Sequence, residues 1–101
     1  MPKVVADVSS KFRIFETNEF QKCLKKLSVS QIKFIQQKLL KYAYPQLRQD
    51  PFLGPNIKKL KNYTPNTWRY RIADFRIFYT VDLNEKIIFI ISLYHRKTAY
   101  R

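Results

Sequence analysis

The 101-residue sequence has few of the residues that mark several large classes of protein. Its single cysteine, Cys23, excludes an internal disulfide and a cysteine-based metal cluster. The longest uncharged apolar run, residues 87–94, is far too short to cross a bilayer as a helix, and residues 1–10 lack the apolar core of a signal peptide. We therefore expect a cytoplasmic protein without a membrane segment.

Acidic residues are also scarce, with 7 Asp and Glu against 20 Lys and Arg, which gives a formal net charge of +13. This excess goes beyond what solubility requires and is typical of proteins that bind a polyanion. Nucleic acid is the first candidate, while an anionic membrane, an acidic protein or a merely basic solvated surface stay open. The carboxylates of Asp74, Asp82 and Glu85 fall in expected turns and form no pair suited to acid–base chemistry. We expect neither a metal nor another cofactor.

The apolar residues, 46% of the chain, are sufficient for one compact domain over residues 1–101, with residues 1–11 as a loose arm. Residues 12–15 alternate as a first strand does. Thr17 or Asn18 can cap a helix that ends near Leu27, and Ser28 and Gln31 have the spacing of a capping box before a longer helix. The apolar stripe of that longer helix is Ile32, Ile35, Leu39, Tyr42, Ala43 and Leu47.

Four strands should follow this antiparallel helical hairpin. Residues 57–61 form a short strand with Leu60 facing inward and Lys59 and Lys61 facing outward. Residues 68–79 form two strands, and the run 87–94, apolar on both faces, belongs inside the sheet. The expected fold is α+β, with the N-terminal strand and the helical hairpin packed on a twisted, largely antiparallel sheet of four to five strands.

The segment 68–79 is the most informative stretch of the chain. If Ala73 and Asp74 form a two-residue turn, all inward pairs are apolar and the outward face carries Arg69, Arg71 and Arg76. Arg71 then lies directly opposite Arg76. Because like charges in this position destabilise a sheet, the arrangement calls for a bound anion.

Three segments together resemble the RelE/ParE superfamily of toxins from toxin–antitoxin systems: NIKKLK at 56–61, WRYRIADFRIFY at 68–79 and SLYHRKTAY at 92–100. The RelE branch is the closer match. The resemblance implies a RelE-like fold and an endonuclease that cleaves mRNA on the ribosome. It also implies an acidic, RelB-like antitoxin that neutralises the toxin in a hetero-oligomer.

The resemblance also assigns roles to single residues. Arg76 matches the arginine of the family's fourth strand, Arg96 the arginine after the last strand, and Tyr100 the tyrosine near the C-terminus. Arg69 and Arg71 stand where relatives carry basic residues on the third strand. One departure is Ala73, which stands where many relatives have glycine, at a turn that needs a positive φ.

The implied chemistry is attack of the ribose 2′-hydroxyl on the adjacent phosphate, without a metal. The catalytic candidates are Arg71, Arg76, Arg96 and Tyr100, because guanidinium groups bind phosphate oxygens in a bidentate way. The candidates for RNA binding are Lys59, Lys61, Arg69, Phe78 and Lys97. Strand alternation places His95 on the face of Phe89, Ile91 and Leu93, away from Arg96, so we expect a structural or supporting role for it.

Two other functions fit the same residues. A ParE-like toxin would share the fold but inhibit DNA gyrase without cleaving RNA. A non-catalytic nucleic-acid-binding module would use the same arginines only to hold phosphates.

Overall fold

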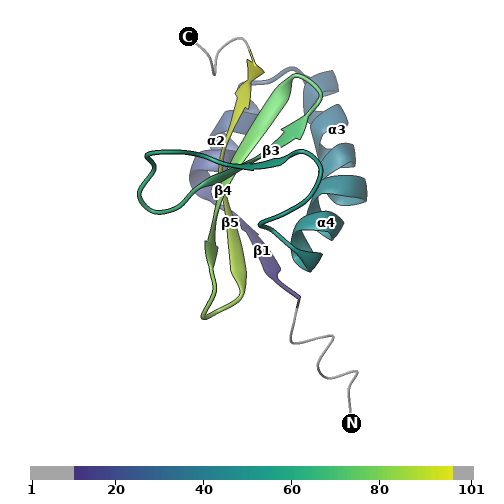
Figure 1. The fold of residues 1–101 in the computed structure, drawn as a ribbon. Coiled ribbons are helices and arrows are strands. Elements are labelled where there is room, and N and C mark those ends of the chain that lie inside the picture. The colour runs from purple at the N-terminus through teal and green to yellow at the C-terminus, as the bar shows by residue number, and fades with distance from the viewer. Residues whose placement is uncertain (1–10, 97–101) are drawn as a thin grey trace.

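The structure is a computed structural model that describes residues 11–96 (Figure 1). Strand β1 (Arg13–Glu16) leads into helix α2 (Asn18–Lys25), and Thr17 caps this helix by accepting a hydrogen bond from the Phe20 amide at 3.2 Å. The first strand and the N-cap predicted from the sequence are confirmed. The loose arm expected over residues 1–11 falls almost wholly outside the described residues.

The longer helix comprises three consecutive segments, α3 (Val29–Lys38), the π-helical turn η1 (Leu39–Ala43) and α4 (Tyr44–Gln49). Ser28 forms the predicted capping box with Gln31. The predicted apolar stripe is wrong at Tyr42, which is 51% exposed, whereas Tyr44 is buried. Tyr42 lies within the π-helical turn, and this turn accounts for the difference because it is wider than an α-helical turn and changes the angular positions of its residues.

The sheet has five strands in the order β1-β5-β4-β3-β2. The bounds of the other four strands are β2 (Ile57–Lys59), β3 (Trp68–Ile72), β4 (Phe75–Asp82) and β5 (Ile87–His95). β1 runs parallel to β5, and the remaining neighbours are antiparallel. The predicted α+β class is confirmed, as is the interior position of β5.

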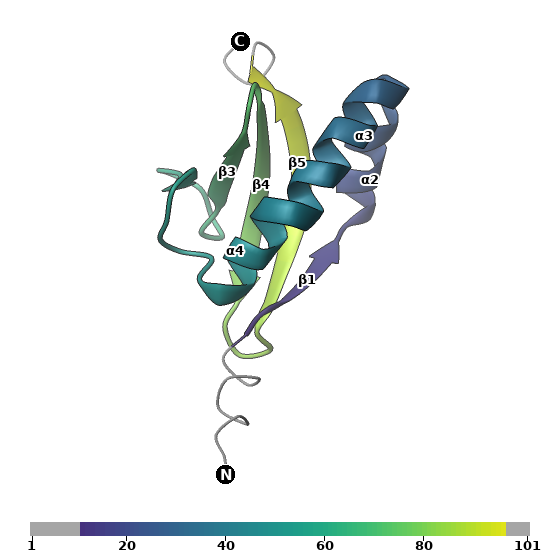
Figure 2. The same cartoon turned by 90° about the vertical axis from the view of Figure 1, so that its right-hand side faces the viewer.

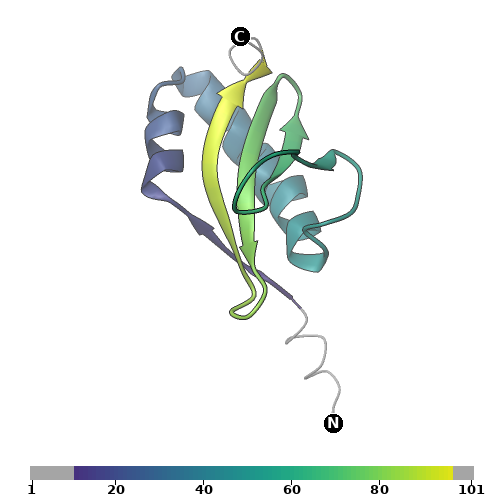
Figure 3. The ribbon, with the colours of Figure 1, turned by 60° about the vertical axis from the view of Figure 1, so that its left-hand side comes forward.

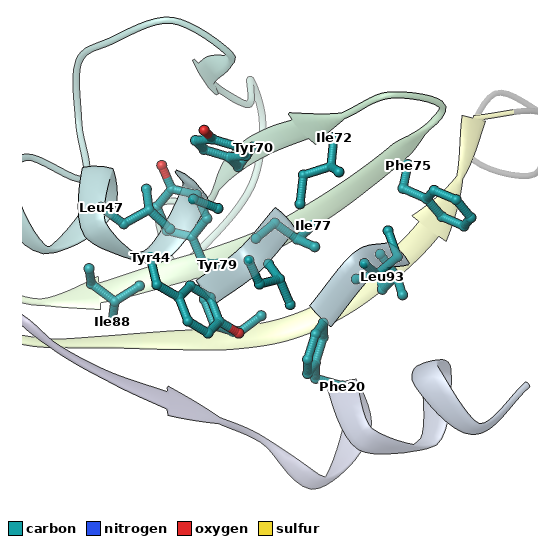
Figure 4. Packing of buried hydrophobic residues seen from close by; sticks show 14 of the residues in the cluster. Phe20, Tyr44, Leu47, Tyr70, Ile72, Phe75, Ile77, Tyr79, Ile88 and Leu93 are labelled. Carbon is teal, nitrogen blue, oxygen red and sulfur yellow. The ribbon is translucent and has the colours of Figure 1, made fainter. Parts of the chain in front are cut away.

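Helix α2 and the three segments of the longer helix all lie on one side of the sheet (Figure 2). Their buried side chains meet those of the strands in one core, in which Phe20, Leu47, Ile77, Tyr79 and Ile88 are fully enclosed (Figure 4). In Figure 3 the long helix passes behind the yellow and green strands, so the near face of the sheet is the one without helices. We call this second surface the open face.

Two buried tyrosines donate hydrogen bonds from their hydroxyl groups within the core. Tyr79 donates to the Pro51 carbonyl at 2.6 Å, and Tyr44 donates to the Glu16 carboxylate at 2.5 Å. Burial raises the pKa of both hydroxyls above its ordinary value, and the hydrogen bond to Glu16 raises the pKa of Tyr44 further. The two contacts connect the helices and the segment after α4 to the sheet.

The chain returns from α4 to the sheet through the turn predicted at residues 50–55. The Asp50 carboxylate accepts hydrogen bonds from the Phe52 and Leu53 amides at 2.9 and 3.2 Å. Gly54 has a φ of +147°, and a Cβ there would lie 2.6 Å from Nε2 of Gln46. Glycine is therefore required at this position. No helix of residues 11–96 is both long and apolar enough to span a membrane.

Candidate functional site

The β3–β4 hairpin has the register predicted from the sequence. Ile72 pairs with Phe75, and Arg71 pairs with Arg76. The same register pairs Tyr70 with Ile77, Arg69 with Phe78 and Trp68 with Tyr79. Ala73 has a φ of +51°, a left-handed conformation that costs about 1–2 kcal/mol for a residue with a side chain. The hairpin therefore places its apolar pairs toward the helices and its arginines on the open face.

The two facing arginines differ in their exposure to solvent. Arg71 is exposed, whereas Arg76 is only 7% exposed, and its Nη1 donates to the Phe75 carbonyl at 3.3 Å. The expectation of a solvated arginine is therefore wrong for Arg76. A guanidinium in such surroundings keeps its charge and acts through a lower effective dielectric than an exposed one. An anion bound beside Arg76 would be attracted more strongly than one on the outer surface.

Arg96 follows the last residue of β5, at the same end of the sheet as Arg71 and Arg76. Its backbone amide donates to the Asp74 carbonyl, and its Nη1 lies 3.8 Å from the Asp74 carboxylate. Asp74 belongs to the β3–β4 turn, so the end of β5 is fixed beside that turn, as seen near the top of Figure 1. The structure therefore places Arg71, Arg76 and Arg96 at one end of the sheet. We call these three residues the arginine cluster.

Aromatic side chains accompany the cluster on the open face. Phe78 pairs with Arg69 on β3 and with Ser92 on β5, and Tyr94 pairs with Arg76. The rings of Phe78 and Tyr94 are in contact, with centroids 5.3 Å apart and planes inclined by 42°. Sequence reasoning missed Tyr94, although the alternation that turned His95 away from Arg96 places Tyr94 on the arginine side.

The lysines of β2 differ from expectation. Lys58, rather than Lys59, pairs with Arg69 and shares its face. Lys59 pairs with Trp68 on the helix-facing side, where its Nζ lies 6.0 Å from the centre of the Trp68 ring. Lys61 follows in the turn after β2 and is exposed. Lys59 is exposed, but it does not share the outward face of the arginines as predicted, because the pairing of β2 with β3, which sets the face, is not local in sequence.

Arg69 lies at the edge of the open face. Its Nη1 donates to the Asn56 carbonyl at 3.1 Å, and the same carbonyl accepts the Arg71 amide at 2.9 Å. The contact holds the Arg69 guanidinium over the start of β2. Such an orientation is suited to an RNA backbone that approaches from this edge, and less suited to the reacting phosphate.

His95 lies on the helix-facing side, where its ring packs edge-on against Phe75 at 5.1 Å. It shares this side with Leu93, as expected, but not with Phe89, which pairs with Thr80 on the open face. An irregularity in the β4–β5 register between Phe78 and Tyr79 shifts the alternation. Because His95 faces away from Arg76 and Tyr94, the geometry favours the expected supporting role.

Two predicted residues, Lys97 and Tyr100, lie outside the described residues. Within residues 11–96, no three His, Cys, Asp or Glu side chains come together in a way that could hold a metal ion. The described part of the site is therefore a cationic and aromatic surface. Its groups are suited to holding a phosphate and an adjacent planar ring.

Comparison with known families identifies the chain. Residues 14–100 match the family described as the ParE toxin of the type II toxin–antitoxin system parDE. The chain belongs to the RelE/ParE superfamily of toxins. The match includes every helix and strand of the structure apart from Arg13, the first residue of β1, so the toxin fold accounts for nearly all of the described region.

Solved structures similar to this toxin come from several organisms. A RelBE toxin–antitoxin complex of Mycobacterium tuberculosis is 19% identical, with a TM-score of 0.67 over 85% of this chain and 99% of that chain. The isolated RelE toxin of Escherichia coli is 19% identical, with a TM-score of 0.60 over 83% of each chain. A RelB–RelE complex of Methanococcus jannaschii is 25% identical, with a TM-score of 0.59 over 85% of this chain and 94% of that chain.

These likenesses establish a RelE-like fold for this toxin. A search of curated proteins finds no match. The family match is to ParE and the similar structures are of RelE, so the fold comparison alone does not separate the two branches. The distinction must come from the residues of the open face.

Proposed function

We propose that this toxin is an endoribonuclease that cleaves mRNA, with the ribosomal A site as the place of cleavage. The observation that carries the proposal is the arginine cluster: Arg71 and Arg76 face each other across β3 and β4, and Arg96 is fixed at the adjacent turn. Two guanidinium groups that face each other create a local excess of positive charge, which favours a bound anion. A phosphodiester has oxygens that match the guanidinium geometry.

The proposed reaction needs no metal. The ribose 2′-oxygen attacks the neighbouring phosphorus, an O2′–P bond forms and the P–O5′ bond breaks. The 2′-hydroxyl loses its proton, the departing 5′-oxygen gains one, and the products are a 2′,3′-cyclic phosphate and a 5′-hydroxyl. Arg71, Arg76 and Arg96 would stabilise the charge that develops on the phosphate oxygens, and Tyr100 would orient the 2′-hydroxyl.

Residues around the cluster would hold the rest of the RNA. Phe78 offers a ring for stacking, and Arg69 and Lys58 form a basic edge along β2 and β3. Lys59, Lys61 and Lys97 would contact RNA backbone at the periphery. Because these contacts are electrostatic, binding should weaken as salt increases.

An acidic, RelB-like antitoxin is the proposed partner, in a toxin–antitoxin hetero-oligomer. The similar structures from Mycobacterium tuberculosis and Methanococcus jannaschii are complexes of a toxin with its antitoxin. In this toxin, a groove of about 470 Å³ lies between the helix and the edge of β3, lined by Phe34, Lys38, Tyr42 and Arg71 among others. An acidic segment with an apolar anchor is complementary to this groove. It would also occupy Arg71, one member of the arginine cluster.

A ParE-like gyrase inhibitor is the second candidate, and the family match to ParE favours it. This function would require a protein-binding surface but no phosphate held between facing arginines. A non-catalytic nucleic-acid-binding module is the third candidate, since binding and cleavage use the same cations. The three are distinguished by what happens to transcripts after expression of the toxin.

The test is primer extension on translated mRNA after brief expression of the wild type, Arg71→Ala and Arg96→Ala. Arg13→Ala is the matched control, because Arg13 is an exposed arginine of β1, which lies beyond β5 from the hairpin. We expect the wild type and Arg13→Ala to produce new 5′-ends. In Arg71→Ala and Arg96→Ala, we expect the rate of cleavage to fall about 100-fold. Growth arrest with intact transcripts would refute the nuclease, and arrest with gyrase-dependent DNA damage would support the second candidate.

A further inference from the structure

The open face carries two pairs of aromatic side chains that touch across neighbouring strands. Phe78 on β4 contacts Tyr94 on β5, with ring centroids 5.3 Å apart. Phe15 on β1 contacts Phe89 on β5, with ring centroids 5.8 Å apart and planes at 73°. The two pairs share one face and similar chemistry, so their surroundings can be compared directly.

Their surroundings differ in positive charge. Tyr94 pairs directly with Arg76, and Phe78 pairs directly with Arg69. Directly opposed residues have Cβ atoms about 4.5–5.5 Å apart, so each ring of this pair lies next to a guanidinium-bearing side chain. Phe89, in contrast, pairs with Thr80 and Phe15. Arg13 is two residues from Phe15 on the same face of β1, but only the Phe78–Tyr94 pair has an arginine directly opposite each ring.

Tyr94 is partly exposed although its ring contacts that of Phe78. It is 37% exposed, whereas Tyr70 and Tyr79 on the helix-facing side of the same sheet are 3% and 0% exposed. The Phe78–Tyr94 pair therefore presents ring surface to solvent, and the buried Arg76 lies directly opposite Tyr94 on β4.

A nucleotide requires this combination of groups. Its phosphate binds guanidinium groups, and its base stacks on an aromatic ring if it is not already paired with another base. We infer that Tyr94, supported by Phe78, is a base-stacking residue for an unpaired nucleotide whose phosphate lies on the arginine cluster. The inference rests on the proposed RNA cleavage and adds a residue to it. It also restricts the substrate to single-stranded RNA, since a duplex keeps its bases stacked on one another.

The test measures binding separately from cleavage. A fluorescein-labelled octaribonucleotide with a 2′-O-methyl group at each position has no free 2′-hydroxyl to attack the phosphate, so its anisotropy reports affinity alone. The variants are Tyr94→Leu, which keeps an apolar side chain but removes the ring, and Tyr94→Trp, which restores a ring. Phe15→Leu is the matched control, because it removes a ring from the aromatic pair that has no arginine directly opposite it.

We expect Tyr94→Leu to weaken binding about tenfold, and Tyr94→Trp and Phe15→Leu to bind as the wild type does. The same oligonucleotide annealed to its complement should bind more weakly to the wild type than the single strand. Equal affinity of Tyr94→Leu and wild type would overturn the inference. Equal loss in Tyr94→Leu and Phe15→Leu would also overturn it, since the apolar surface rather than its location would then matter.

Cleavage of mRNA by the wild type is measured in parallel by primer extension. If the wild type cleaves mRNA but Tyr94→Leu binds normally, the stacking inference fails and the nuclease stands. If the wild type leaves mRNA intact but binding depends on Tyr94, the nuclease fails and the stacking site stands. The two results therefore separate the inference from the proposed function.

Discussion

The two faces of the sheet differ in character although the same strands supply both. Along β4, Ile77 and Tyr79 are fully buried against the helices, while the residues between and beside them, Arg76 and Phe78, belong to the open face. The helix-facing side is apolar and holds the fold together. The open face combines cations and rings, and we expect changes there to alter function much more than stability.

The largest expected effect lies on the helix-facing side. Ile77→Ala would leave a cavity in the core and lower the free energy of unfolding by about 2–5 kcal/mol. Thr80→Ala, on the open face of the same strand, is the matched control and should change it by less than about 0.5 kcal/mol. Urea unfolding measures both. A Thr80→Ala variant as unstable as Ile77→Ala would contradict the division between the faces.

Arg76 is an intermediate case, because it belongs to the open face but is buried. Arg76→Ala should lower the free energy of unfolding by about 1–3 kcal/mol, since the packed stem of the side chain is lost. Arg76→Met retains most of that stem and should preserve stability while reducing mRNA cleavage about 100-fold. Urea unfolding and primer extension on both variants test this. If Arg76→Met cleaved mRNA as efficiently as the wild type does, Arg76 would not be part of the site.

The smallest expected effect concerns two buried tyrosines of the core, Tyr44 on α4 and Tyr79 on β4. Their pKa is raised in the folded state, so their stabilising contribution is complete below pH about 10 and is lost as the pH rises above that value. Each tyrosine should contribute a decrease of about 1 kcal/mol in the free energy of unfolding between pH 10 and 11. Tyr79→Phe should remove the part of this decrease that comes from Tyr79. An unchanged pH profile in that variant would argue against the assignment.

Local patterns predicted much of the fold. The capping box at Ser28 and the full register of the β3–β4 hairpin follow from short-range spacing, which the chain alone determines. Errors arose where a non-local or irregular feature intervened. At the π-helical turn, Tyr42 is exposed although it was expected to be buried, and Tyr44 is buried. The pairing of β2 with β3 places Lys59 beside Trp68 and away from the face of the arginines.

The candidate site was predicted in part for the same reason. Arg71 and Arg76 could be paired from the hairpin alone, but the burial of Arg76 depends on its surroundings in three dimensions. The contact of Arg96 with Asp74 joins residues that only the folded sheet brings together. Tyr94 was recognised as a candidate residue only from the pairing of β4 with β5, because that register places it beside Arg76.

The parallel pairing of β1 with β5 has a consequence for the order in which the chain can fold. The ribosome makes β1 first and β5 last among the described strands, and the two are joined by pairs such as Arg13 with Ile87. Contacts between such distant residues form late and slow the folding of a domain. Tyr94 and Arg96 come from β5 or its end, so a nascent toxin lacks its site until nearly all of the described chain has been translated.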